Sequence, residues 1–179
     1  MDFINGHAGR RDGIIALFKD AFTASEGEAE GDLVASLVTG MLSSVAQDDI
    51  FVSSAIDDGT LVGTVIFTRM DYTEDERTVF ILSPAAISTR RQGEGIGQAL
   101  LSHGLNTLRK SGVDVVLTYG DPNFYSKVGF ETITEEIARA PLPLSHPEGW
   151  LGQSLKTEAL KPLQGAPTCV APLNDPSLW

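Results

Sequence analysis

The segment from Ile87 to Gly97, Ile-Ser-Thr-Arg-Arg-Gln-Gly-Glu-Gly-Ile-Gly, constrains this chain more than any other part of it. A β-rich run leads into a glycine-rich turn, and the turn opens a helix that is predicted to begin near Gly95. Glycine lacks the Cβ atom that would keep an anion away from the backbone. The unpaired N–H groups and the positive dipole end of the helix then point into the turn. The segment therefore predicts a binding site for a pyrophosphate group.

Two common nucleotide-binding motifs do not fit this turn. A Walker loop ends in Gly-Lys-Ser/Thr, whereas this turn continues as Gly95-Ile96-Gly97-Gln98-Ala99. A Rossmann fingerprint needs Gly-x-Gly-x-x-Gly near the start of a βαβ unit, with an acidic residue about twenty positions later. The spacing of Gly93, Gly95 and Gly97 does not meet that requirement.

The turn does match the pattern Gln/Arg-x-x-Gly-x-Gly/Ala, over Gln92 to Gly97. In this form it resembles the acyl-coenzyme A loop of the GNAT superfamily of N-acetyltransferases. The alternative is a plain strand-to-helix turn, because glycine-rich turns are common. A second segment favours the resemblance: Tyr125 to Phe130 reads Tyr-x-x-x-Gly-Phe, which is the other signature of the superfamily. The form Gly-Asp-Pro-x-x-Tyr, from Gly120 to Tyr125, is similar to a bacterial branch of predicted acetyltransferases.

The resemblance implies a mixed α/β domain of the GNAT acyl-coenzyme A N-acyltransferase fold. In that fold two parallel strands of a central mixed sheet splay apart to admit the cofactor, and helices flank the sheet. It also implies that acetyl-coenzyme A is the co-substrate, without a metal. The residues expected to bind it are Ala86, Ile87, Ser88, Arg91, Gln92, Gly93, Glu94, Gly95, Ile96, Gly97, Gln98 and Asn123.

These residues have different expected roles. Backbone N–H groups of residues 92–97 would hold the pyrophosphate, with Arg90 and Arg91 meeting the phosphates. Backbone near Ile87 would polarise the thioester carbonyl. Glu94 is expected to point into solvent, because a carboxylate beside a pyrophosphate weakens an anion site. Asn123 has two interpretations, as a donor to the pantetheine amides or as a cap of its turn.

Tyr125 is expected to protonate the departing sulfur. A phenol with a pKa of about 10 stays protonated at neutral pH and can donate to a thiolate whose conjugate acid has a pKa of about 8.5. The alternative is that the ring packs beside Phe124 and Phe130 with its hydroxyl bonded elsewhere. The presence of both motifs favours the catalytic role.

The general base has no obvious candidate. Several members of the superfamily carry a glutamate in the strand before the glycine loop, but residues 78–87 here contain no carboxylate and no histidine. A base could come from Glu28, Glu30 or Asp32, water could relay the proton, or the acceptor could have a low pKa. Residues of a second predicted helix are, however, more often a solvated face than a catalyst.

Hydrophobic periodicity predicts helices over residues 12–24, 27–42 and 95–110, with a short one over 122–128. Strands are predicted over residues 50–56, 60–70, 78–87 and 113–117. The opening strand is poorly marked at residues 2–4. The chain is expected to form one domain over 1–179 with a proline-rich extension from about 134. Residues 153–155 and 169–171 are expected to be edge strands there. Trp150 and Trp179 would line an acceptor pocket, close the core or meet a partner.

Composition narrows the partners and the location. A net charge of −11 argues against binding to nucleic acid, whose phosphates would be repelled. No apolar run reaches membrane-spanning length, the first residues lack the regions of a signal peptide, and the single cysteine, Cys169, cannot form an internal disulfide. The expected location is the bacterial cytoplasm. No His/Cys grouping has metal-ligand spacing. Exposed edge strands would permit a homodimer.

Two functions therefore remain open. The first is an N-acetyltransferase that moves an acetyl group from acetyl-coenzyme A to a primary amine of a small molecule or a protein. The second is a non-catalytic acyl-coenzyme A binding module that senses or scaffolds. Tyr125 favours the enzyme, and the missing strand carboxylate favours the module.

Overall fold

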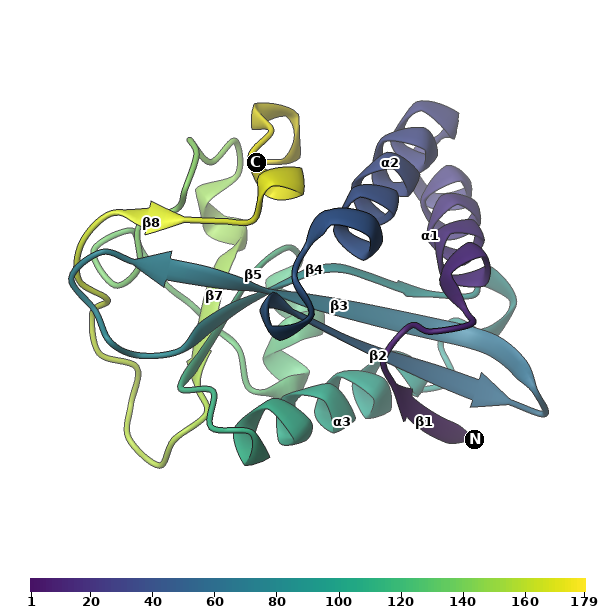
Figure 1. Cartoon of the computed structure of the whole chain (residues 1–179), viewed down its shortest axis with the longest axis horizontal. Coiled ribbons are helices and arrows are strands. Elements are labelled where there is room, and N and C mark those ends of the chain that lie inside the picture. Colours follow the sequence, from purple (N-terminus) through teal and green to yellow (C-terminus); the bar gives the residue numbers. More distant parts are fainter. The chain divides into compact units, whose positions relative to one another are not determined.

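The chain forms a mixed sheet of eight strands (Figure 1). The computed structural model describes all 179 residues. The strand order is β1-β2-β3-β4-β5-β7-β6, and β8 pairs with β3. The helices are α1 (Arg11–Glu26), α2 (Glu28–Ser44), α3 (Ile96–Lys110) and α4 (Pro122–Tyr125). The strands are β1 (Asp2–Asn5), β2 (Ile50–Asp57), β3 (Thr60–Tyr72), β4 (Val79–Ile87), β5 (Val115–Tyr119), β6 (Glu131–Thr132), β7 (Trp150–Ser154) and β8 (Pro167–Thr168). The predicted mixed α/β class is confirmed. None of the helices combines the length and apolar character needed to cross a bilayer.

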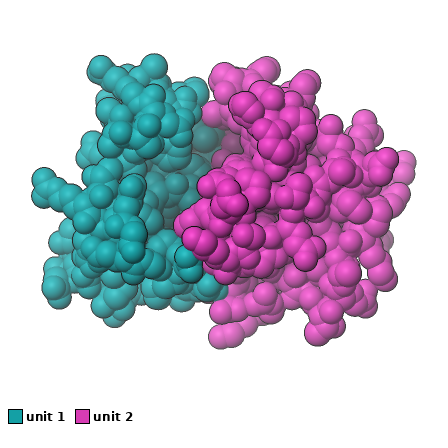
Figure 2. All heavy atoms as spheres, turned by 180° about the vertical axis from the view of Figure 1, so that it is seen from behind, with its two compact units in different colours: residues 1–67, 84–104 teal, residues 68–83, 105–179 magenta.

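The chain forms two compact units, which Figure 2 shows in different colours. The first unit contains residues 1–67 and 84–104, and the second contains residues 68–83 and 105–179. Because β3, β4 and α3 each cross a boundary, both units draw on the same long elements. The predicted glycine loop belongs to the first unit, and Tyr125 belongs to the second.

In the first unit, helices cover both faces of the sheet (Figure 1). The α1–α2 pair lies on one face, with buried Phe18 and Met41 in its apolar stripe. Gly31 lets these helices approach closely, since a Cβ there would overlap with Thr23 Oγ1. The first turns of α3 pack on the other face, where a Cβ at Gly63 would lie 3.2 Å from Leu100 Cδ2. The weakly marked opening strand forms as β1 and pairs antiparallel with β2, from Asp2↔Ile56 to Asn5↔Ser53.

In the second unit, the parallel ladder between β4 and β5 is short. It runs from Val79↔Val115 to Leu82↔Thr118 and ends there. β5 continues beyond this point against β7, with which it pairs antiparallel as far as Tyr119↔Trp150. At the last rung the Thr118 hydroxyl donates to the Leu82 carbonyl oxygen at 2.9 Å. The end of this ladder is the place where the fold is expected to open.

Of the two edge strands predicted for the tail, one is found in part and the other is wrong. The segment expected at residues 153–155 is only the end of a longer strand, β7: Gln153 and Ser154 pair with β5 alone, as an edge would, whereas Leu151 and Gly152 pair with β5 and also with β6. β7 contains no proline, so nothing prevents pairing on both sides. Residues 169–171 do not form a strand: β8 is Pro167–Thr168, because the end of β3 offers partners only at Asp71 and Tyr72.

Trp150 and Trp179 close the core of the second unit. The two rings lie 6.0 Å apart, edge to face, and Trp179 stacks on Tyr119 at 6.1 Å. Trp150 Nε1 donates to the Ala138 carbonyl and Trp179 Nε1 donates to the Leu173 carbonyl. Both indole N–H groups therefore have partners although the rings are buried.

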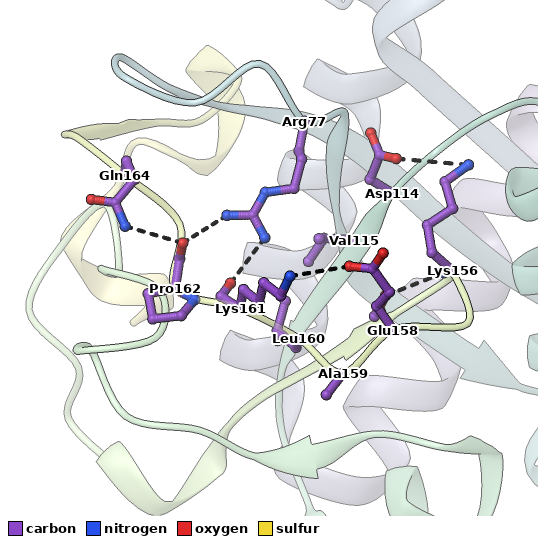
Figure 3. A pocket seen from close by; sticks show the side chains of 11 residues that line it. Arg77, Asp114, Val115, Lys156, Glu158, Ala159, Leu160, Lys161, Pro162 and Gln164 are labelled. Atoms are coloured by element: carbon purple, nitrogen blue, oxygen red, sulfur yellow. Dashed lines mark hydrogen bonds and ion pairs between the residues drawn. The ribbon is translucent and has the colours of Figure 1, made fainter.

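Two charged side chains, Arg77 and Asp75, hold the loop of residues 156–164 in the second unit. Arg77 donates to the carbonyl oxygens of Lys161 and Pro162 and pairs with Asp75 at 2.7 Å, beside a cavity of about 610 Å³ (Figure 3). Asp75 also accepts from the Gln164 backbone N–H at 3.0 Å. The hydrogen bond from Arg77, followed by bonds from backbone N–H groups, holds the pKa of the Asp75 carboxyl at about 2, below its ordinary 3.8.

Replacing Asp75 with asparagine is expected to lower the free energy of unfolding by about 2 kcal/mol at pH 7. The folded pKa is lower than the unfolded one, so this stabilisation is present above pH 4 or so and is lost as the pH falls from about 4 to about 2. Urea unfolding at pH 7, 4 and 3 measures the effect. Glu158→Gln, at an exposed acid of the same unit, is the control and should change little. A constant difference between Asp75→Asn and the unmodified protein at all three pH values would contradict the prediction.

Candidate active site

The glycine loop forms at the end of β4 in the first unit. The Ser88 backbone N–H donates to the Val62 carbonyl at 2.8 Å, which fixes the point where the chain leaves the sheet. A single 3₁₀ turn follows, over Thr89–Arg91. Gly93 and Gly95 then have φ angles of 81° and 79°, a conformation that side chains other than glycine rarely adopt. The Gly95 carbonyl accepts the Ala99 N–H at 3.1 Å, so α3 opens directly out of the loop.

The space at these glycines is open. A Cβ built at Gly93 or at Gly95 meets no atom within 4 Å. The first N–H groups of a helix have no acceptor within that helix, and here they belong to Ile96, Gly97 and Gln98 in the opening turn of α3. Open space, positive φ and free backbone donors are the features that an anion-binding turn requires.

Arg91, beside the loop, is already paired with two carboxylates. Arg91 Nη1 lies 2.8 Å from Asp57 Oδ2, and Arg91 Nε lies 2.9 Å from Glu94 Oε2. The hydrogen bond from Arg91 lowers the pKa of the Asp57 carboxyl, and both carboxylates raise the pKa of Arg91. The Glu94 side chain is 45% exposed but bends back to Arg91 instead of standing free in solvent. An incoming phosphate would therefore compete with Asp57 and Glu94 for this guanidinium.

Replacing Glu94 with glutamine is expected to tighten binding of coenzyme A by about threefold to tenfold, because it removes a like charge from the loop and releases one side of Arg91. Isothermal titration measures the change. Glu74→Gln, at an exposed acid of the other unit, serves as the control. Weaker binding by Glu94→Gln would show instead that Glu94 positions Arg91 for the phosphate.

Gln92 and the end of β4 complete the predicted loop residues. Gln92 Nε2 donates to the Ile87 carbonyl at 3.3 Å, which closes the loop back on the strand. Ala86 is buried, and Ile87 and Ser88 are half-buried. The structure thus brings residues 86–98 together in the first unit. It places Asn123 and Tyr125 in the second unit.

The short helix α4 begins with a side-chain cap. Asp121 Oδ1 accepts the Asn123 backbone N–H at 2.9 Å, and Pro122 occupies the first turn. The cap is therefore Asp121, and the interpretation of Asn123 as the capping residue is wrong. The Asn123 side chain is exposed. Gly129 ends the following turn in the left-handed conformation, with φ 96°.

The Tyr125 ring is held by three neighbours. It meets Phe124 and Phe130 edge to face, at 5.1 and 5.7 Å between centroids. A Cβ at Gly120 would lie only 2.7 Å from Tyr125 Cε2, so the ring lies directly against that backbone. The packing expected under the structural interpretation is therefore present, and it fixes where the hydroxyl lies.

The Tyr125 hydroxyl reaches the end of the β4–β5 ladder. Burial raises its pKa, and a hydrogen bond with the Thr118 side chain offsets part of that rise. Thr118 is the last residue of β5 that pairs with β4. A phenol with a raised pKa is neutral at physiological pH, which a proton donor requires.

The acids proposed as bases lie on α2. Glu28 and Asp32 are exposed, Glu30 is half-buried, and Asp32 pairs with Lys19 at 2.8 Å.

The sequence did not indicate a group of polar residues that the structure brings together in the second unit. A cavity of about 320 Å³ there is lined by Tyr119, Gly120, Pro122, His146, Glu148 and Gly149. No motif marks it, because its two walls are 24 or more residues apart in the sequence.

Comparison with known proteins shows to which family this chain belongs. Residues 46–132 match the model of the acetyltransferase (GNAT) domain. The uncharacterised N-acetyltransferase YjhQ of Escherichia coli K12 is 32% identical over 148 residues, which cover 80% of this chain and 79% of YjhQ. The uncharacterised N-acetyltransferase YhbS of the same strain is 30% identical over 135 residues, covering 73% and 74%. This chain belongs to the GNAT acetyltransferase family.

Solved structures agree with this assignment. The crystal structure of Escherichia coli YhbS in complex with coenzyme A superposes with a TM-score of 0.78 at 25% identity, covering 97% of this chain and 92% of that one. A GNAT acetyltransferase from Brucella melitensis, in complex with acetyl-coenzyme A, gives a TM-score of 0.70 at 20% identity and covers 97% of both chains. The second likeness supports the fold alone. The GNAT fold predicted from the two motifs is confirmed.

Proposed function

We propose that this protein transfers an acetyl group from acetyl-coenzyme A to a primary amine of a small molecule or a protein. Membership of the GNAT acetyltransferase family supports acyl transfer in general. The observation that carries the proposal to this cofactor is the open turn at Gly93 and Gly95, with both residues at positive φ, at the start of α3. The crystal structure of YhbS with coenzyme A, a relative of the same fold, supports it further.

Each unit would contribute its own residues to the reaction. The loop of residues 92–98 would hold the pyrophosphate through backbone N–H groups, and the backbone of residues 86–88 would bind the pantetheine arm. Tyr125 would donate its proton to the departing thiolate, since its hydroxyl is neutral and fixed by ring packing. Residues 1–179 would therefore act as one functional domain. The relatives are bacterial, which supports a role in a bacterial cell.

The alternative of a non-catalytic binding module keeps one observation in its favour: β4 carries no carboxylate. The two functions differ in thiol release. Acetyl-coenzyme A is titrated into the purified protein, and release of the thiol is then followed against a panel of amines. Binding with amine-dependent release is the result expected of the enzyme. Binding without release for any amine would favour the module, and absence of binding would overturn both.

A further inference from the structure

An alkylamine acceptor must lose a proton before it attacks a thioester. With a pKa of about 10.4, less than about a thousandth of such an amine is neutral at pH 7. β4 supplies no base, and Asp32 on α2 is already paired with Lys19. A histidine, His146, lines the cavity of about 320 Å³ in the second unit.

This cavity lies next to the proposed proton donor. Gly120 forms part of its wall, and the same residue lies against the Tyr125 ring. Gly149 lies beside Gly120 in the same lining, and a Cβ there would lie 3.0 Å from the Gly120 carbonyl oxygen. The Gly120 N–H also donates to the Gly149 carbonyl at 2.9 Å. The missing side chains of these two glycines thus let the lining of the cavity pack closely against the Tyr125 ring on one side and the Tyr119 ring on the other.

His146 and Glu148 stand at this cavity as a pair. His146 Nδ1 lies 3.5 Å from Glu148 Oε1. The His146 backbone N–H donates to the Tyr119 hydroxyl at 2.6 Å, and the His146 carbonyl accepts the Gly149 N–H at 2.9 Å. The backbone of His146 is therefore fixed to the cavity wall. A carboxylate beside Nδ1 favours the tautomer with the proton on Nδ1, which leaves Nε2 as an acceptor.

We infer that this cavity receives the acceptor amine, that His146 Nε2 removes its proton, and that Glu148 attracts its positive charge. The inference rests on the proposed function and adds the acceptor class to it: a small, cationic primary amine, or the side chain of one. A volume of about 320 Å³ is at the lower end of the range for small-molecule sites. The negative charge of the whole chain, −11, favours the same cation.

The reaction balances as follows. The ammonium gives one proton to His146 Nε2, and the neutral nitrogen attacks the thioester carbonyl. As the C–N bond forms and the C–S bond breaks, the thiolate takes the proton of Tyr125. The second proton of the attacking nitrogen restores Tyr125, and the imidazolium releases its proton to water. The products are the N-acetyl amine, free coenzyme A and one proton.

Two substitutions separate the roles of the pair. His146→Gln is expected to lower kcat for alkylamines by about 100-fold and to remove the acid limb of the pH profile, which protonation of a general base produces. The titratable groups that contact His146 are Glu148 and Tyr119. Glu148→Gln is expected to raise KM for cationic amines by about threefold to tenfold, because the charge is lost. It should change kcat little, because the glutamine Oε1 can still accept from His146 Nδ1–H. Neither variant should alter the affinity for acetyl-coenzyme A.

The chain offers matched controls. Glu158 is a carboxylate of the same unit with nearly the same exposure, 71% against 73%, and it is likewise paired, with Lys161 at 3.3 Å. Glu158→Gln should leave KM unchanged, and His7→Gln, in the first unit, should leave kcat unchanged. Weakly basic amines, which are neutral at pH 7, should be acetylated by His146→Gln almost as fast as by the unmodified protein. Because His146 and Glu148 are exposed, both variants are expected to fold.

The possible outcomes separate the role of His146 from the proposed acetyltransferase activity on which it rests. If the unmodified protein releases thiol with amines but His146→Gln keeps its acid limb and its rate, the inference is overturned and the proposed function stands. If Glu30→Gln removes the acid limb instead, the base lies on α2 and the inference is equally overturned. If no amine causes thiol release from the unmodified protein, the proposed function fails and the inference fails with it.

Discussion

Replacing Tyr125 with phenylalanine is expected to reduce turnover by about 100-fold to 1,000-fold while the affinity for acetyl-coenzyme A stays the same. The ring contacts with Phe124, Phe130 and Gly120 do not use the hydroxyl, so phenylalanine can keep them. Only the proton donor at Thr118 is removed. The thiolate must then leave without a proton or take one from water.

Thiol release and isothermal titration, measured on the same sample, test this expectation. Tyr72→Phe is the control, because Tyr72 is buried and its hydroxyl donates to the Arg139 carbonyl at 2.7 Å. That variant should lose about 1 kcal/mol of stability and keep its turnover. A Tyr125→Phe variant that turns over at the normal rate would show that another group or water protonates the sulfur.

Replacing Gly95 with alanine is expected to weaken acetyl-coenzyme A binding by at least about tenfold. The backbone at Gly95 has φ 79°, where an alanine is strained. The open space around the position means that the new methyl group would project to where a phosphate approaches. Both effects act on the bound anion, whereas the rest of the first unit keeps its packing.

Gly112→Ala is the matched control for that experiment. Gly112 has φ 93° and open space as well, but it follows the far end of α3 and belongs to the second unit. Its substitution should cost a similar amount of stability without changing affinity. Equal affinity in Gly95→Ala and Gly112→Ala would contradict the assignment of the glycine loop as the cofactor site.

The sequence was sufficient for elements whose local pattern and tertiary role agree. α3 was predicted over residues 95–110 and runs from Ile96 to Lys110, because the glycines before it and the apolar stripe within it specify the same start and face. The Asp58-Gly59 pair between β2 and β3 is typical of a tight hairpin turn, and both residues have positive φ. The two family motifs gave the GNAT fold for the same reason, since each marks a turn with special backbone geometry.

What could not be predicted depends on contacts between distant segments. The place of β7 between β5 and β6 follows from its pairing with β5, whose residues lie from 31 positions (Tyr119↔Trp150) to 39 positions (Val115↔Ser154) earlier in the chain. The ion pair between Arg91 and Asp57 and the hydrogen bond from the Gly120 N–H to the Gly149 carbonyl likewise join residues far apart in the chain. Spacing within one motif carries no information about such partners. The roles of the loop residues and of Tyr125 stay predictions.

The paired state of Arg91 bears on how the protein would respond to ionic strength. Proteins that grip phosphates with free lysines and arginines bind more weakly as salt rises. Here Arg91 is already neutralised by Asp57 and Glu94, and the chain as a whole carries −11. Backbone N–H groups do not depend on a counterion atmosphere, and added salt screens the repulsion between an acidic protein and an anionic cofactor. The part of cofactor recognition that rests on the backbone would therefore hold as the ionic strength rises, whereas a contact from the exposed Arg90 would weaken.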